Sequence, residues 1–174
     1  MSHYLEWSRA YSHRLNAADA APLQARAAEL GVRLERALAQ GVLPFLSMPY
    51  RATLERDLPP ILEKVRTRKH MVVLGIGGSA LGARALQKAF APGQDRPGHD
   101  GPCLWIADNV CAEEFEALLG GLDAADTSVV CISKSGGTIE TISQYFLVRD
   151  WLKASVGEGW QDQMIVVTDE NKGY

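Results

Sequence analysis

The sequence contains two short clusters of glycine and hydroxyl-bearing residues, each directly after a run of apolar residues. The first is Gly75-Ile76-Gly77-Gly78-Ser79, and the second is Ser133-Lys134-Ser135-Gly136-Gly137-Thr138. Glycine lets the backbone turn tightly and bring its N–H groups close to a ligand, while serine and threonine add hydroxyl donors. A helix that follows such a loop contributes free N–H groups and a dipole that favours an anion. The pattern predicts that these segments, called the first loop and the second loop below, bind a phosphate group.

A structural explanation is open for each loop. Glycine-rich turns join strands to helices without any ligand, and a serine or threonine at a helix start is often only an N-cap, worth about 1 kcal/mol. Two such loops at one sheet edge, the second with three hydroxyls in six residues, favour phosphate binding. Lys134 is either part of this site or a solvated surface lysine. Glu140 is interpreted as structural, because an inward carboxylate would repel phosphate.

A dinucleotide site is the main rival for the first loop. Gly75-x-Gly77-x-x-Ala80 satisfies the G-x-G-x-x-G/A fingerprint, and Asp108 near the end of the next strand could bind a ribose. However, Asp108 comes 33 positions after Gly75 rather than about 20, and the fingerprint gives the second loop no role. A P-loop is excluded because no G-x-x-x-x-G-K-[ST] string occurs.

Short apolar runs without alternation predict the strands that position these loops. Such strands are buried on both faces and belong in parallel sheets. With the helix-like stretches between them they give a β-α-β-α-β-α-β order, which indicates a doubly wound α/β sheet. Ligands of such sheets bind beyond the carboxyl ends of the strands, at a switch point in strand order. The expected strands are residues 71–74, 103–107, 128–132 and 164–167, and the expected helices are 80–90, 112–119 and 138–152.

The first part of the chain is predicted to be helical. Leucines at spacings of four predict an amphipathic helix over residues 18–40. Glycine and proline then break the pattern, and a second helix is expected to open near Pro59-Pro60, with Ile61, Leu62 and Val65 facing inward. We therefore divide the chain into a helical N-terminal segment, residues 1–69, and a ligand-binding domain, residues 70–174.

Composition excludes several classes of protein. A chain of 174 residues that is 47% hydrophobic can bury a core, and a net charge of −3 with interspersed signs does not favour nucleic acid or anionic membranes. The sequence has neither an apolar run of about 18 residues nor a signal-peptide pattern, so we expect a cytoplasmic protein. An odd number of cysteines without Cys-x-x-Cys spacing argues against disulfides and zinc. We expect burial for the two that lie in apolar runs, Cys103 and Cys131, while Cys111 lies outside them.

Residues 72–82, around the first loop, closely resemble the signature of the glucose-6-phosphate isomerase family. Residues 133–141, around the second loop, resemble the phosphate loop of that family, and residues 166–169 with Lys172-Gly173 are similar to its next strand end. Gly136-Gly137 stand where the family often has bulkier residues, so the second loop is also similar to those of generic sugar isomerase (SIS) phosphosugar binders. The resemblance covers residues 70–174.

The resemblance implies an SIS fold and a cofactor-free interconversion of glucose 6-phosphate and fructose 6-phosphate, a step of glycolysis and gluconeogenesis. It also implies a homodimer whose sites are completed across subunits. The family takes its glutamate base, histidine and arginine from later sequence, so we expect no catalytic residue here and a chain truncated before a second SIS domain. Residue by residue, it implies a phosphate site and sugar contacts formed by Ser133, Ser135, Thr138 and the backbone N–H of Lys134, with Gly78 and Ser79 touching the sugar.

The remaining titratable residues carry no catalytic pattern. Asp108 and Asp169 follow strands, where an aspartate more often caps a helix or turn than acts as a base. The histidines are expected to have surface or packing roles: His3, His13, His70 and His99. Two other functions stay open, a non-catalytic SIS module that senses a phosphosugar and the dinucleotide-binding half of an oxidoreductase. Residues 1–69 show no basic helix-turn-helix, which speaks against a DNA-binding regulator.

Overall fold

The computed structural model describes residues 17–171 except 47, 51, 97 and 170. His3, His13, Lys172 and Gly173 lie outside the described residues. The chain divides into two compact units, Met1–Leu54 and Glu55–Tyr174. In the first unit, α1 (Ala17–Ala39) confirms the predicted amphipathic helix, and two short 3-10 helices follow, η2 (Pro44–Leu46) and η3 (Met48–Tyr50).

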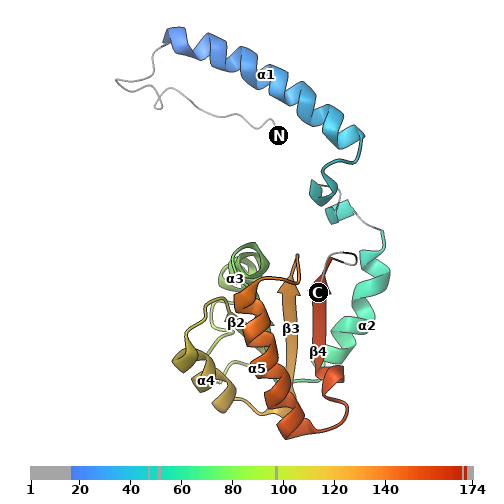
Figure 1. Ribbon diagram of the computed structural model, residues 1–174, viewed down its shortest axis with the longest axis vertical. Helices are drawn as coiled ribbons and strands as arrows, with labels where there is room; N and C mark the ends of the chain where they lie inside the picture. The colour runs from blue at the N-terminus through green and yellow to red at the C-terminus, as the bar shows by residue number, and fades with distance from the viewer. Residues whose placement is uncertain (1–16, 47, 51, 97, 170, 172–174) are drawn as a thin grey trace. The chain divides into compact units, whose positions relative to one another are not determined.

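The second unit is built on a parallel sheet of four strands in the order β2-β1-β3-β4 (Figure 1). The predicted strands are confirmed, with small shifts at their ends. Because the chain passes from β1 to one side and then returns to the other, the sheet is doubly wound and its switch point lies between β1 and β3. The strands are β1 (His70–Leu74), β2 (Cys103–Ala107), β3 (Thr127–Ser133) and β4 (Met164–Thr168).

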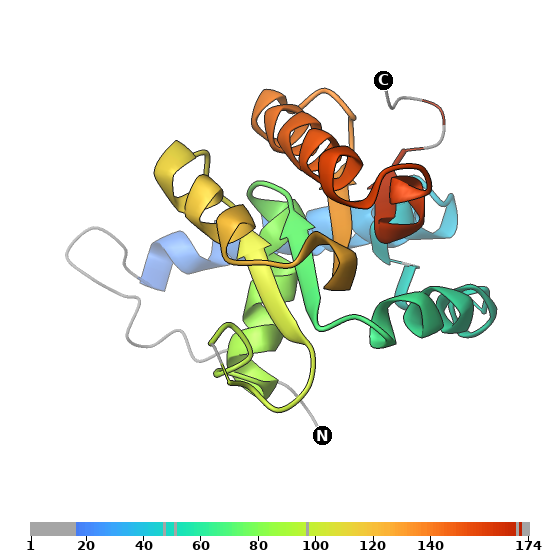
Figure 2. The same cartoon turned by 90° about the horizontal axis from the view of Figure 1, so that it is seen from below.

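Helices lie on both faces of this sheet. Figure 2 shows α4 (Ala112–Gly120) and α5 (Ile139–Val156) on one face, and α3 (Gly78–Phe90) on the other, on the same side as α2 (Leu54–Arg66). The three helices between the strands were predicted, and this arrangement confirms the doubly wound α/β class. Among the described residues, none of the helices is long and apolar enough to span a membrane.

The start of α2 differs from the sequence prediction. It begins at Leu54 rather than near Pro59-Pro60, so both prolines lie inside the helix. Acidic residues in its first turn interact favourably with the positive end of the helix dipole and offset part of the cost of the prolines. Ile61 and Leu62 are exposed, which makes their predicted inward orientation wrong. Val65 is buried as predicted, so α2 packs through a residue near its C-terminal end.

The main core lies between the sheet and the helices α4 and α5. Val72 and Leu74 of β1 and Val129 of β3 are fully buried there against Val148 and Leu152 of α5. Successive strand residues alternate between faces, so Val73 points to the α3 side, where Ala80 is also buried. Each fully buried aliphatic side chain stabilises the fold by about 1.5–3 kcal/mol relative to its exposed state.

The cysteines behave largely as small apolar residues. Cys103 and Cys131 are buried, as predicted, and all three cysteines are free thiols. Burial raises the pKa of the Cys131 thiol. Cys131 follows Val129 on the α5 side of β3 and belongs to the same core cluster.

Strand β4 departs from the expectation of burial on both faces. It is the last strand in the sheet order, and Val166 and Val167, which point to opposite faces, are both exposed. Val166 lies opposite Cys131 in the ladder. The α5 side of β4 is therefore open next to the end of β3 that precedes the second loop.

The core predicts a difference between two leucines of α5. Leu152 is 0% exposed and Leu147 is 58% exposed. Leu152→Ala should lower the free energy of unfolding by about 3 kcal/mol, because it leaves a cavity in the core, whereas Leu147→Ala should change it by less than about 0.5 kcal/mol. Urea unfolding followed by circular dichroism measures both, and equal effects would contradict this description of the core.

Candidate functional site

The two loops lie side by side at the carboxyl ends of β1 and β3. These strands pair directly, with Leu74 opposite Cys131. The first loop starts directly after Leu74, and the second starts two residues after Cys131. A Cβ atom on Gly75 would lie 2.9 Å from Cβ of Ser79 and 3.3 Å from the carbonyl oxygen of Ile132, so the backbones approach as closely as glycine allows. The predicted placement of both loops at one edge of the sheet is confirmed, and the structure adds that this is the switch point.

The first loop turns directly into α3. Gly77 has φ +57° and ψ −123°, a conformation that glycine adopts readily, and its carbonyl oxygen accepts a hydrogen bond from the N–H of Ala80 at 3.0 Å. Gly78 is exposed, and Ser79 is half-buried. Both residues stand in the first helical turn, and the backbone N–H of Ser79 donates to the carbonyl oxygen of Ile76 at 3.2 Å.

The second loop is a tight turn before α5. Gly136 has φ +65°, and its N–H donates to the carbonyl oxygen of Ser133 at 3.3 Å. The hydroxyl oxygen of Ser135 accepts a hydrogen bond from the N–H of Gly137 at 3.2 Å. Thr138 occupies the N-cap position of α5, but its hydroxyl makes no capping hydrogen bond to the described backbone. Ser135 therefore has a structural contact, whereas simple capping does not explain Thr138.

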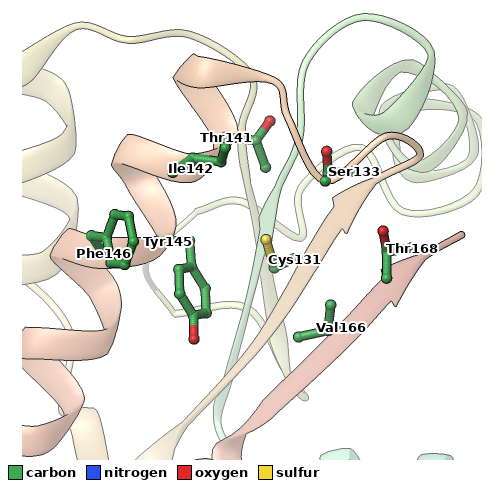
Figure 3. A pocket seen from close by; sticks show the side chains of 9 residues that line it. Cys131, Ser133, Thr141, Ile142, Tyr145, Phe146, Val166 and Thr168 are labelled. Carbon is green, nitrogen blue, oxygen red and sulfur yellow. The ribbon is translucent and has the colours of Figure 1, made fainter. Parts of the chain in front are cut away.

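Two buried hydroxyl groups lie at the second loop, one on its first residue and one on α5. The side-chain oxygens of Ser133 and Thr141 are inaccessible to solvent and have no hydrogen-bond partner within the described part of the chain. They line a cleft of about 460 Å³ between α5 and the strands β3 and β4 (Figure 3). Their hydroxyls lie at the loop end of this cleft, and Tyr145 and Val166 line its other part. A buried polar group without a partner costs about 1–3 kcal/mol, so a ligand that hydrogen-bonds to these hydroxyls would remove that cost.

The charged residues around the second loop differ in exposure and in hydrogen bonding. Lys134 is exposed and Glu140 is half-buried. The backbone carbonyl of Lys134 accepts a hydrogen bond from the N–H of Asp169 at 3.2 Å, which fixes the loop to the end of β4. The carboxylate of Asp169 accepts from the N–H of Asn171 at 2.9 Å, so this aspartate stabilises a turn, as the sequence indicated.

Asp108 is engaged by an arginine rather than left free. Arg84 donates from Nε to one carboxylate oxygen at 2.8 Å and from Nη2 to the other at 2.7 Å. Such a bidentate pair uses both oxygens of the carboxylate. Asp108 is thus not arranged to receive a ribose, and this weakens the dinucleotide interpretation. Both carboxylate oxygens of Asp108 bind Arg84, rather than capping a helix or turn as the sequence indicated.

The histidines that the structure describes lie away from both loops. His70 begins β1 at the opposite end of the sheet, and its Nδ1 accepts a hydrogen bond from Nε1 of Trp105 at 3.3 Å. The backbone N–H of His99 donates to the backbone carbonyl oxygen of Arg96. Within the described ranges, no group of three His, Cys, Asp or Glu side chains is arranged to hold a metal ion.

The sequence reasoning missed three residues near the loops: Arg84, Thr141 and Gln144. Arg84 follows the buried Ala80 by four positions on α3, and Gln144 follows the buried Thr141 by three positions on α5. Residues at these spacings share one helix face. A polar residue at helical spacing from buried positions indicates a side chain that faces the core, and this pattern could have identified all three.

The fold and its two switch-point loops define a doubly wound α/β domain of the SIS type. A family model described as phosphoglucose isomerase matches residues 63–173. A glucose-6-phosphate isomerase of Carboxydothermus hydrogenoformans is 35% identical over 153 residues, which cover 82% of this chain and 32% of that protein. One from Thermus thermophilus is 34% identical over 132 residues, which cover 76% and 30%.

Two solved structures are also similar. A hypothetical protein from Thermus thermophilus matches with a TM-score of 0.62 and 32% identity, over 87% of this chain and 36% of that one. A glucose-6-phosphate isomerase from Chlamydia trachomatis matches with a TM-score of 0.56 and 27% identity, over 66% and 22%. The chain belongs to the phosphoglucose isomerase family. It spans about a third of the length of the curated relatives that it matches.

The close approach of the loops predicts opposite effects for two glycines. Gly75→Ala should lower the free energy of unfolding by about 1–3 kcal/mol, because the new methyl group would overlap Ser79 and the backbone of β3. Gly82→Ala should raise it by about 0.5–1 kcal/mol, since Gly82 lies inside α3 with open space around it. Urea unfolding measures both. A neutral Gly75→Ala would contradict the close packing of the first loop on β3.

Proposed function

We propose that this chain is the sugar-phosphate-binding part of a glucose-6-phosphate isomerase, which interconverts glucose 6-phosphate and fructose 6-phosphate. The observation that carries the proposal is the pair of unpartnered, buried hydroxyls of Ser133 and Thr141 beside the uncapped N-terminus of α5. Membership of the phosphoglucose isomerase family supports the choice of substrate. A homodimer and a cytoplasmic location rest on the sequence alone and stay predictions.

The second loop would bind the phosphate. Its hydroxyl groups, on Ser133, Ser135 and Thr138, supply donors without a positive charge. The carbonyl of Ser133 is turned toward the N–H of Gly136, and in a trans peptide the N–H of Lys134 points the opposite way. That N–H is therefore free of the turn and available to an oxygen of the ligand. The N-terminus of α5, an 18-residue helix, adds its dipole.

The first loop would touch the sugar. Gly78 and Ser79 stand at the start of α3, beside the second loop, because β1 and β3 are neighbours. Gly78 has open space where a side chain would stand, so a ligand can approach its backbone. A sugar phosphate that extends from the second loop to the first would use the N-termini of two helices, with its charged end at α5.

Isomerisation also needs groups that move protons. An aldose-ketose isomerase requires an acid and a base to open the sugar ring, and a carboxylate that transfers a proton between two carbons through an enediol. Of the aspartates near the loops, Asp108 is held by Arg84 and Asp169 accepts a backbone hydrogen bond. We therefore propose that the described residues bind and orient the substrate, and that the proton-transferring groups come from other sequence.

The second loop predicts a specific loss of affinity. Ser135→Ala and Thr138→Val should each weaken binding of glucose 6-phosphate to the 174-residue chain about tenfold, since each removes a hydrogen bond to a charged group. Ser143→Ala is the matched control, because that exposed hydroxyl on α5 donates to the carbonyl oxygen of Ile139 and lies outside the loop. Isothermal titration calorimetry measures all three.

Titration with other ligands separates the alternatives. Binding of NAD but not of glucose 6-phosphate would overturn the proposal in favour of the dinucleotide interpretation. Binding of glucose 6-phosphate that survives both loop substitutions would contradict the assigned site. Turnover of glucose 6-phosphate by the 174-residue chain alone would contradict the division between substrate binding and proton transfer.

A further inference from the structure

The segment Ile106–Asn109, here called the β2 end segment, belongs to neither loop but is hydrogen-bonded to the elements that carry both. It comprises the last two residues of β2 and the two that follow. Three of its carbonyl oxygens and its one carboxylate accept hydrogen bonds from α3, from α5 or from the start of the first loop. These hydrogen bonds connect the β2 end segment to both helices that carry the proposed binding loops.

Arg84 connects this segment to the helix of the first loop. Besides its bidentate contact with Asp108, its Nη2 donates to the carbonyl oxygen of Ile106 at 3.0 Å. Arg84 lies on α3, fewer than two turns after Ser79. Both charged side chains are half-buried. The planar guanidinium fixes distance and orientation together, so α3 is held at a defined position relative to the end of β2.

Gln144 connects the same segment to the helix of the second loop. It is 2% exposed, and its Nε2 donates to the carbonyl oxygen of Asn109 at 2.9 Å and to that of Ala107 at 3.3 Å. Its own oxygen, Oε1, is buried without a partner among the described residues. An apolar side chain of similar size would avoid the cost of this unpaired oxygen. It would, however, leave the carbonyl oxygens of Ala107 and Asn109 without this donor, so the two contacts account for a glutamine here.

The carbonyl oxygen of Ala107 accepts hydrogen bonds from both α5 and the first loop. It accepts from Nε2 of Gln144 and also from the N–H of Gly75, the first residue of the first loop, at 3.5 Å. Strand β1 separates β2 from β3 in the sheet, so Gln144 reaches from α5 across the end of β1. Its amide therefore connects α5 to the end of β2, on the far side of β1 from β3.

We propose that Gln144 and Arg84 are positioning residues, which use the β2 end segment to set the separation between the first and the second loop. This inference rests on the proposed function, because it assumes that one sugar phosphate touches both loops. The separation matters only to a ligand that spans them. Glucose 6-phosphate spans both loops, while inorganic phosphate occupies the second loop alone.

The test compares these two ligands on one substitution. Gln144→Met keeps the length of the side chain and removes both donated hydrogen bonds. Glucose 6-phosphate should bind to the Gln144→Met chain about tenfold more weakly, because small displacements of a positioned group are costly, while the affinity for inorganic phosphate should stay within about twofold. Calorimetric titration of the 174-residue chain with each ligand gives both values.

Gln163→Met is the matched control. Gln163 is also 2% exposed, its Nε2 donates to the carbonyl oxygens of Ala124 and Thr127, and its Oε1 is likewise unpaired among the described residues. It directly precedes β4, and its side chain contacts the start of β3, at the end of the sheet away from the loops. Gln163→Met should change the stability of the chain but leave the affinities for both ligands within about twofold.

The possible outcomes are distinct. Equal weakening of both ligands by Gln144→Met would show local damage to the second loop and overturn the inference, as would no weakening of either. If the unsubstituted chain binds neither ligand, the proposed function fails and the inference fails with it. If Gln144→Met does not fold, Asp108→Asn tests the contact of the β2 end segment with Arg84. Asparagine has the shape of aspartate, but its amide N–H₂ replaces an oxygen that accepts from the guanidinium. The same selective loss for glucose 6-phosphate is expected, and an unselective result would overturn the inference.

Discussion

The direct pairing of β1 with β3 is the constraint on which the site depends. These strands lie next to each other only because the chain passes from β1 to β2 on one side and then returns across β1 to form β3. That order brings two loops from distant parts of the sequence to one edge. Gly75 makes the contact possible, since any side chain there would meet Ser79 and the backbone of Ile132. The helices α3 and α5 then present their N-termini on either side of the junction.

The site would hold an anion mainly with neutral groups. Lys134 is the cationic residue within the second loop and its side chain is exposed, while the other donors are hydroxyls and backbone N–H groups. Fixed neutral donors bind charge well, because they need little reorganisation when the ligand arrives. Binding of this kind depends on geometry more than on charge. For this reason the hydrogen bonds of Arg84 and Gln144 to the β2 end segment matter, since we propose that they set the separation of the two loops.

Much of the second unit could be predicted from the sequence. The unalternated apolar runs predicted all four strands, and the glycine and hydroxyl clusters located both loops. The sequence reasoning failed where tertiary contacts decide: Pro59-Pro60 looked like a helix start but lie within α2, and Ile61 and Leu62 looked buried but are exposed. The partnership of Arg84 with Asp108 joins residues on different elements, so local patterns did not reveal it. The unpaired state of Ser133 and Thr141 required the packed structure.

The central claim is that the two loops hold one ligand together. The most direct measurement is a titration of the isotopically labelled 174-residue chain with glucose 6-phosphate, followed by backbone amide NMR shifts. We predict that the amides of residues 77–79 and 133–138 shift together, with the same apparent dissociation constant, while those of Gln163 and His70 at the opposite end of the sheet do not move. Shifts confined to one loop, or two different dissociation constants, would contradict the claim.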